Sequence, residues 1–564
     1  MSVNGGEVLL EVFQSYGIEY IFCSPGTEWA PVWEGLAKRY SQGDESIKYI
    51  NCRHESLAVS AAIGYSQATG QLSAVLLHAA VGPLNGALAI RAATIARTPI
   101  IICAGDTAAF GVNKDEKSAP PWWLSILSNV GGNDTLVNNY VKWSNTVTSK
   151  ETLMGSVYRS CGIARTPVTG PVFLSIPLEY MLEEQPPVRI PAPSPAAALP
   201  EPQARDLEEV ADQLLGSKQP IIITEYAGEN PEAVPSLVEL AELLSIPVFE
   251  CLSAQFANFP RENLLHGGYN AAEALKTADT IFVVGAVTPW LPGSDFPQKD
   301  SRVIFLDDDT LKLRLPYWGY RVDLSITADI KRWLDALLGV LHTKISKSSD
   351  NRQRFEYWRT NHEHLIKTWE AEALNGQRNK PISPGWFLHR VGQILPANSI
   401  IVEETITHRN FIQRFAVRPG AYFRANGGLG VGLGTAVGSK LAHPDKPVIF
   451  FVGDGTYNYN PVLAGLGLCQ EFNLPILTIV MNNGSYAAMI SGYKKHYPQG
   501  TAVRRNAYLG VNITPQPDYA MIAEAFDAYG EKVIEPDEIE PALNRALEQL
   551  ANGRAALLDV VLES

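Results

Sequence analysis

Long uncharged hydrophobic runs are missing from this chain of 564 residues. No stretch approaches the roughly 18 apolar residues that a helix needs to cross a bilayer, so no membrane span is expected. The opening residues, MSVNGGEVLLEVFQSYG, contain no cationic segment followed by a long apolar run. That absence predicts no signal peptide, and together the two absences predict a cytoplasmic protein.

Cysteine is scarce as well, and an excess of positive charge is lacking. The six cysteines form neither a CxxC pair nor a metal-ligand spacing, which is typical of small core residues in a reducing compartment. The net charge of −13 argues against nucleic acid or an anionic membrane as a partner. The hydrophobic fraction of 46% and the length predict an ordinary globular protein of three to four domains.

Two short apolar runs near the C-terminus end abruptly in small polar residues. Residues 448–452 (VIFFV) precede 453–456 (GDGT), and residues 476–480 (ILTIV) precede 482–484 (NNG). Such runs predict buried strands of a parallel sheet, and residues 461–472 between them are long enough for a crossover helix. Both polar clusters therefore fall at carboxyl ends of strands, where ligands bind in open α/β sheets.

These clusters carry oxygen atoms that suit a magnesium ion. Asp454 offers a carboxylate and Asn483 offers an amide oxygen. Mg²⁺ prefers hard oxygen ligands supplied singly, with room left for phosphate oxygens. Gly455 lets the backbone approach a ligand closely, and the hydroxyl of Thr456 is placed to donate to phosphates. Each cluster alone would be an ordinary turn; the two together predict a Mg²⁺–diphosphate site.

Strand and helix patterns alternate along the whole chain, which predicts α/β domains with doubly wound parallel sheets. A Pro- and Ala-rich stretch, residues 183–206, predicts an extended linker, and the polar helical stretch 342–380 predicts a second connection. The predicted domains are therefore residues 1–182, 207–341 and 381–564.

The spacing of GDG and NN resembles the signature of thiamine diphosphate (ThDP) enzymes. Residues 53–56 (RHES) and 61–70 (AAIGYSQATG) are similar to the pyrimidine-binding domain of the same enzymes. The resemblance spans about residues 5–560 and points to the ThDP-dependent 2-oxo-acid decarboxylase and acetohydroxyacid-synthase superfamily. Residues 426–430 (NGGLG) and 481–486 (MNNGSY) look most like benzoylformate decarboxylases. The implied domains are pyrimidine-binding, middle and diphosphate-binding.

The resemblance also assigns roles to residues. Glu55 would hydrogen-bond the aminopyrimidine and favour the imino tautomer that removes the cofactor's C2 proton; without the resemblance it is an acid at a helix start. Leu429 falls where an apolar side chain holds the cofactor bent, and it is equally a core leucine. The backbone carbonyl of Ser485 would join Asp454 and Asn483 as a ligand of Mg²⁺. The other implied cofactor-binding residues are Thr405, Thr407, Gly428, Gly453, Gly455, Thr456 and Tyr486.

Substrate contacts are implied in the first domain. Thr27 falls where a serine of the decarboxylases contacts the substrate carboxylate, and His78 falls where a histidine transfers protons. A histidine at a strand end is often structural, and that alternative stays open. The family's second histidine is missing from residues 285–293, and no adjacent histidine pair occurs. The basic residues of 493–505 are interpreted either as an anion site or as a solvated loop, and Trp122-Trp123 as a pocket or an interface.

The implied reaction is decarboxylation of a 2-oxo acid through a C2-carbanion and enamine. The enamine is then protonated to an aldehyde or transferred to a second carbonyl. An acetohydroxyacid-synthase-like carboligase and a non-catalytic paralogue are the alternatives. No flavin is predicted, because the synthases' flavin contacts do not map onto residues 207–341. In the family the cofactor lies between two subunits, which predicts a homodimer at minimum and a homotetramer as the usual form.

Overall fold

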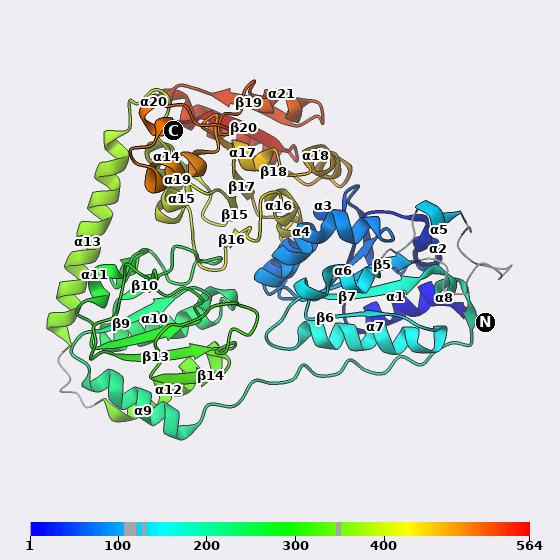
Figure 1. The fold of residues 1–564 in the computed structure, drawn as a ribbon, viewed down its shortest axis with the longest axis horizontal. Coiled ribbons are helices and arrows are strands. Elements are labelled where there is room, and N and C mark those ends of the chain that lie inside the picture. The colour runs from blue at the N-terminus through cyan, green and yellow to red at the C-terminus, as the bar shows by residue number, and fades with distance from the viewer. Residues whose placement is uncertain (1, 107–119, 121, 127–130, 346–350, 564) are drawn as a thin grey trace.

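The computed structural model describes residues 2–106, 120, 122–126, 131–345 and 351–563 (Figure 1). Three six-stranded sheets, in which every paired strand is parallel, form three α/β units, as the alternating pattern predicted. A small antiparallel pair, β1 (Val3–Asn4) with β8 (Glu184–Gln185), ties the start of the chain to the start of the linker.

The first sheet has the order β3-β2-β4-β5-β7-β6. Its central strands are apolar and fully buried, and helices cover both faces. The strands are β2 (Tyr20–Cys23), β3 (Lys48–Asn51), β4 (Ser73–Leu77), β5 (Ile100–Asp106), β6 (Trp143–Thr146) and β7 (Val172–Pro177). The helices are α1 (Gly5–Ser15), η1 (Thr27–Trp29), α2 (Ala30–Ser41), α3 (Glu55–Thr69), α4 (Val81–Ile95), α5 (Trp123–Ile126), α6 (Asn133–Val137), η2 (Asn138–Tyr140), α7 (Lys150–Arg165) and α8 (Leu178–Leu182).

The last sheet repeats this topology with the order β16-β15-β17-β18-β20-β19. Counted along the chain, both sheets run 2-1-3-4-6-5. The strands are β15 (Ile400–Glu404), β16 (Tyr422–Arg424), β17 (Val448–Gly453), β18 (Ile476–Asn482), β19 (Tyr529–Val533) and β20 (Ala556–Val561). The helices are α14 (Pro384–Ile394), α15 (Arg409–Phe415), α16 (Gly432–Ala442), α17 (Asp454–Tyr457), α18 (Val462–Glu471), α19 (Ala487–His496), α20 (Thr501–Arg505), α21 (Tyr519–Glu524), η4 (Pro536–Glu538) and α22 (Ile539–Ala551).

The middle sheet differs, with the order β11-β10-β9-β12-β13-β14, which is 3-2-1-4-5-6 along the chain. This is the order of dinucleotide-binding folds, whose ligand crevice lies where the order reverses. The strands are β9 (Pro220–Thr224), β10 (Val248–Glu250), β11 (His266–Gly268), β12 (Thr280–Val284), β13 (Arg302–Asp307) and β14 (Leu324–Thr327). The helices are α9 (Ala204–Gly216), η3 (Ala227–Glu229), α10 (Ala233–Leu244), α11 (Ala272–Leu275) and α12 (Ile330–Lys344).

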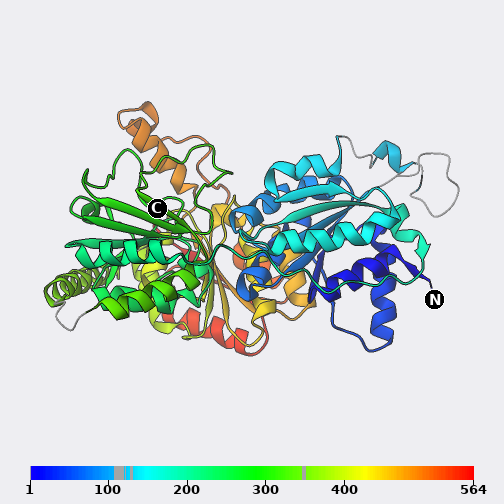
Figure 2. The ribbon, with the colours of Figure 1, turned by 90° about the horizontal axis from the view of Figure 1, so that it is seen from below.

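Two segments connect the three units. Residues 186–203 form neither helix nor strand and run along the outside of the molecule (Figures 1 and 2). The segment after α12 contains one long helix, α13 (Arg352–Asn375). All six cysteines are buried and free. Among the described helices, none has both the length and the apolarity needed to cross a membrane.

Helices α3 and α16 join the first and last units at very close range. A Cβ added to Gly438 would lie 1.9 Å from the carbonyl oxygen of Ala61, and one added to Gly64 would lie 2.0 Å from that of Thr435. Only glycine permits this approach of two helix backbones. One continuous apolar core includes Val59 of α3 and Val437 of α16, so the two sheets are packed as a single body.

We expect Gly438→Ala to destabilise the protein, since its methyl group would meet backbone that has no side chain to move aside. Overpacking of this kind typically costs about 1–3 kcal/mol in unfolding free energy. Gly339→Ala in α12 is the matched control, because a Cβ there meets no atom within 4 Å and alanine favours a helix by up to about 1 kcal/mol. Calorimetry should show a lower melting temperature for the first variant only. Equal shifts would contradict the role given to the α3–α16 contact.

Candidate active site

The carboxyl ends of β17 and β18 lie side by side, because the two strands pair in parallel with Gly453 opposite Met481. A cavity of about 370 Å³ opens there. Its walls include many of the residues predicted to hold the cofactor and metal: Thr407, Leu429, Gly453, Asp454, Gly455, Thr456, Asn483, Ser485 and Tyr486. The predicted Gly428 lies one residue outside this lining.

Asp454 has the character of a metal ligand. Its Oδ2 atom is buried and has no hydrogen-bond partner among the described residues. Burial raises the pKa of this carboxyl to about 6, although backbone amides of Gly455, Gly484 and Asn483 act in the opposite direction. A buried carboxylate oxygen without a partner is costly unless a cation balances it. The side-chain oxygen of Asn483, which accepts from the Ser485 amide at 3.1 Å, is the second oxygen of the pair. The donor set therefore fits Mg²⁺.

Leu429 lies on a loop in which the neighbouring residues have backbone conformations that favour glycine. Gly427, Gly428 and Gly430 have φ angles of +104°, +151° and +103°. The loop is fixed by Glu404, whose Oε1 accepts from the amides of Gly430 at 2.8 Å and Val431 at 2.9 Å. Burial raises the pKa of Glu404 to about 7. No sequence motif singles out this glutamate, which positions Leu429 at the cavity wall.

The two threonines after β15 have different surroundings. The hydroxyl of Thr405 is buried and donates to Glu403 at 2.5 Å, so it does not line the cavity. Thr407 does line it, together with Ile406 and His408, which sequence reasoning missed. Burial lowers the pKa of His408 to about 4, so this imidazole is neutral at pH 7.

The second group of predicted residues lies in the first unit. His78 follows β4, and its Nδ1 lies 2.8 and 2.9 Å from the two carboxylate oxygens of Glu28. Glu28 is fully buried in η1 and also accepts from the amide of Ala79 at 2.7 Å. Cβ atoms at Gly26 and Gly105 would lie 2.2 Å from His78 Nδ1 and 2.0 Å from Glu28 Cγ, so both glycines make room for the pair.

The Glu28 hydrogen bond is the main cause that raises the pKa of His78, opposed by burial and aided by the charges of Glu28 and Glu55. Glu55 begins α3, and its Oε2 accepts from Asn85 Nδ2 at 2.5 Å. Thr27 is exposed at the start of η1, directly before Glu28. Sequence analysis missed Glu28, because the residue lies fifty positions from its partner.

The structure thus contains two half-sites. No described residue of the first unit lines the cavity around Asp454, so Thr27, Glu55 and His78 do not share it within one chain. One half carries a positioned histidine with a carboxylate and can move protons. The other half carries oxygen ligands and glycine-rich backbone, and can hold a diphosphate with its metal.

Two other sequence features are placed but gain no role. The basic residues of 493–505 belong to α19 and α20, neither of which has a buried residue. This pair of helices projects from the last unit (Figure 2). Trp123 is buried and packs with Leu178, whereas Trp122 is 59% exposed.

Three family models match the chain. They are described as thiamine pyrophosphate enzyme, N-terminal TPP binding domain (residues 3–120), central domain (207–337) and C-terminal TPP binding domain (407–560). Together they match well over half of the sequence.

Curated relatives align over almost the whole chain. A benzoylformate decarboxylase of Pseudomonas aeruginosa is 28% identical over 573 residues, covering 98% of this chain and 97% of the relative. The large subunit of acetolactate synthase isozyme 3 of Escherichia coli is 23% identical, covering 100% and 95%. A ThDP-dependent 4-hydroxybenzoylformate decarboxylase structure from Rhodococcus jostii superimposes with a TM-score of 0.80 at 24% identity, covering 100% and 99%. The structural likeness establishes the fold.

The contact between Glu28 and His78 predicts that the carboxylate of Glu28 raises the pKa of His78. Glu28→Gln keeps the shape but removes the anion, so the pKa of His78 should fall. His78 should then lose its proton at a lower pH than in the wild type. The alkaline limb of the pH–rate profile of any step that needs protonated His78 should therefore shift to lower pH. The rate should fall by no more than the roughly 10²- to 10⁴-fold that general acid–base catalysis contributes.

NMR titration of the histidine ring protons, with His78 assigned by difference from His78→Gln, measures the effect directly. Glu34→Gln, the same change on the exposed face of α2, is the control. An unchanged titration of His78 in Glu28→Gln would show that the carboxylate does not set its protonation.

Proposed function

The chain belongs to the thiamine pyrophosphate enzymes, in the group of ThDP-dependent decarboxylases and acetolactate synthases, and we propose that it decarboxylates a 2-oxo acid with ThDP and Mg²⁺. The observation that carries this proposal is the unpartnered, buried carboxylate oxygen of Asp454 beside Asn483. When bound, ThDP supplies the carbanion chemistry of C–C bond cleavage.

The chain's own residues supply binding and proton transfer. Asp454, Asn483 and the carbonyl of Ser485 would hold Mg²⁺, and the hydroxyls of Thr456 and Thr407 would donate to phosphate oxygens of the cofactor. Leu429 would contact the cofactor through its apolar side chain. The carboxylate of Glu55 would hydrogen-bond the pyrimidine and favour its imino tautomer.

In the substrate half-site, Thr27 donates to the carboxylate of the 2-oxo acid. His78, held by Glu28, carries the proton that the product requires. The enzyme then releases an aldehyde or passes the acyl unit to a second carbonyl, and product analysis distinguishes the two.

The active unit is a homodimer or a dimer of dimers. One chain keeps its two half-sites in separate places, whereas the chemistry needs Glu55 and Asp454 on one cofactor. A second copy that presents its first unit to the cavity around Asp454 satisfies this requirement twice, because a two-fold interface is reciprocal.

The middle unit favours an enzyme without flavin. Its crevice between β9 and β12 is where a dinucleotide would bind in a sheet of this order. The buried carboxylate of Glu225 accepts from the amides of Val287 at 2.8 Å and Thr288 at 3.0 Å. Asp307 likewise accepts from the amide of Ala286 at 3.1 Å. The amides that would face a pyrophosphate are therefore already bonded to negative charges.

Purified protein should accordingly be colourless. An absorbance spectrum after gel filtration, together with fluorescence of the heat-released supernatant, tests for flavin. Yellow protein with flavin fluorescence would contradict this reading of the crevice and would favour a synthase-like enzyme.

The function itself is tested by separating cofactor binding from cofactor activation. Asp454→Ala should lose ThDP on gel filtration. Glu55→Gln should retain it, while exchange of the cofactor C2 proton with deuterium slows at least about 10²-fold. Wild-type protein given a panel of 2-oxo acids should release CO₂, and Glu55→Gln should not.

Asp44→Asn, which removes a half-buried carboxylate of the first unit that pairs with Arg39 at 2.9 Å, is the control for charge loss. Full ThDP retention by Asp454→Ala would overturn the metal-site assignment. C2 exchange at the wild-type rate in Glu55→Gln would show that Glu55 does not activate the cofactor and is only an acid at the start of a helix.

A further inference from the structure

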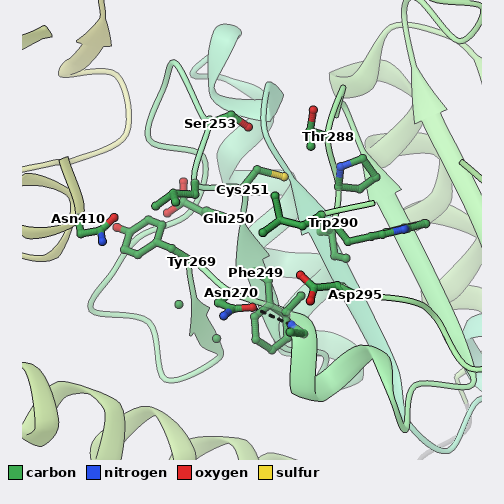
Figure 3. Close-up of a pocket in the computed structure, with 18 of the residues that line it drawn as sticks. Phe249, Glu250, Cys251, Ser253, Tyr269, Asn270, Thr288, Trp290, Asp295 and Asn410 are labelled. Carbon is green, nitrogen blue, oxygen red and sulfur yellow. Dashed lines mark hydrogen bonds between the residues drawn. The ribbon is translucent and has the colours of Figure 1, made fainter. Parts of the chain in front are cut away.

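A cavity of about 650 Å³ lies outside both half-sites, between the middle and last units. It is bordered by the carboxyl ends of β10 and β11, by residues 288–291 after β12, by α13 and by the start of α15 (Figure 3). Cavities of about 300–1,000 Å³ are the usual size for small-molecule sites. Neither the cofactor nor the substrate residues described above reach it.

The walls of this cavity are largely aromatic. Phe249 and Trp290 are 4% and 8% exposed, and Tyr269 and Trp369 complete the lining. Tyr269 and Trp369 stack with ring centroids 6.1 Å apart. Such surfaces favour a flat apolar ligand, because aromatic rings gain both burial and ring–ring contact.

One end of the cavity carries two guanidinium groups, those of Arg409 and Arg424, beside a single carboxylate. The Nε atom of Arg409 is buried without a hydrogen-bond partner, and its guanidinium forms no ion pair with any described residue. Arg424 lies close by: its Nη1 donates to the carbonyl of Ser253 at 3.1 Å, and its Nε is 3.6 Å from the Glu403 carboxylate. Burial and the charge of Arg424 both lower the pKa of Arg409. Glu403 is thus the single anion beside two guanidinium groups.

The remaining charged groups of the lining do not fill this role. Arg414 is paired with Glu372 at 2.6 Å. Glu250 is occupied by the amide of Asn258 at 2.6 Å and by His266 at 3.2 Å. Asp295 lies across the cavity from Asn410, the neighbour of Arg409 (Figure 3). An anionic ligand group is therefore favoured at the Arg409 end and disfavoured at the other.

We propose that this cavity is a regulatory site for an aromatic carboxylate, whose carboxylate pairs with Arg409 and Arg424 while its rings lie between Phe249, Tyr269 and Trp290. Arginine suits this role because its planar fork matches a carboxylate with two parallel hydrogen bonds. The volume accommodates two fused rings. The cavity adjoins the crevice between β9 and β12, because Thr288 lines the cavity and its amide donates to Glu225 in that crevice.

The site is connected to the cofactor cavity through one short segment. Arg409 directly follows Ile406, Thr407 and His408, which line the cavity around Asp454. A ligand held by Arg409 therefore restrains the segment that presents Thr407 to the diphosphate. Because linkage is reciprocal, a ligand that changes ThDP affinity must have its own affinity changed by ThDP by the same factor.

Titration of the holoenzyme with 2-naphthoate, followed by calorimetry and by naphthoate fluorescence, tests the site. 2-Naphthamide is the neutral isostere and should bind at least tenfold more weakly. Arg409→Met should weaken 2-naphthoate at least tenfold, which is the size of a lost charge-assisted pair. Arg409→Lys should recover part of the affinity, and Arg205→Met, a change on the exposed surface of α9, should bind as the wild type does.

Ala272→Trp provides a second variant, because Ala272 lines the cavity and a tryptophan there would occupy part of its volume while both arginines are kept. It too should abolish binding. Equal binding of 2-naphthoate by wild type, Arg409→Met and Ala272→Trp would overturn the site, since any affinity would then come from elsewhere. A ThDP dissociation constant that responds to 2-naphthoate equally in wild type and Arg409→Met would overturn the coupling. Both results are independent of which 2-oxo acid the enzyme decarboxylates.

Discussion

The close contact of α3 with α16 is the constraint on which the rest of the architecture depends. Two sheets of the same strand order are held together at backbone range by Gly64, Gly434 and Gly438. Glu55 begins one of these helices, and the loop carrying Leu429 leads into the other. The contact that builds one chain therefore also fixes both half-sites in space. Because those half-sites stay apart within the chain, the α3–α16 contact that holds the monomer together is different from the subunit contact that, in the proposed homodimer, would complete the active site.

Carboxylates at strand ends are the second recurring device. Glu404 at the end of β15, Glu225 after β9 and Asp307 at the end of β13 each accept backbone amides and so fix a loop. Asp454 occupies the equivalent place after β17 but keeps one buried oxygen without a partner. Among these four residues, three have their carboxylates engaged by backbone amides, and Asp454 keeps a buried oxygen without a partner. This difference separates the crevice between β9 and β12 from the cavity around Asp454.

Much of this could be predicted from sequence, and the failures have physical causes. Runs such as residues 448–452 and 476–480 are apolar, β-branched and bounded by glycine or asparagine, so the three parallel-sheet domains and the family were predicted and are confirmed. Edge strands such as β11 (HGG) and β19 (YGEKV) were missed, because pairing on one side leaves them short or polar. Glu28 and Glu404 were missed because their importance lies in contacts across 51 and 26 positions of the chain. The roles assigned to individual site residues stay predictions.

The middle unit connects the two halves in a way that no motif indicated. Arg97 of the first unit lies over the ring of Tyr226 at 4.5 Å and donates to Asp308 at 2.7 Å. On its other side the middle unit meets α15, whose preceding segment lines the cofactor cavity. Loss of one partner of a buried ion pair strongly destabilises a protein. The contact between Arg97 and Asp308 therefore fixes the first unit against the middle unit. The contact with α15 instead contains a cavity, lined by Arg409, whose guanidinium forms no ion pair with a described residue. This contact constrains the two units less tightly. The proposed anion site thus lies beside the crevice in which Glu225 accepts backbone amides, and one short segment away from Thr407 at the cofactor cavity.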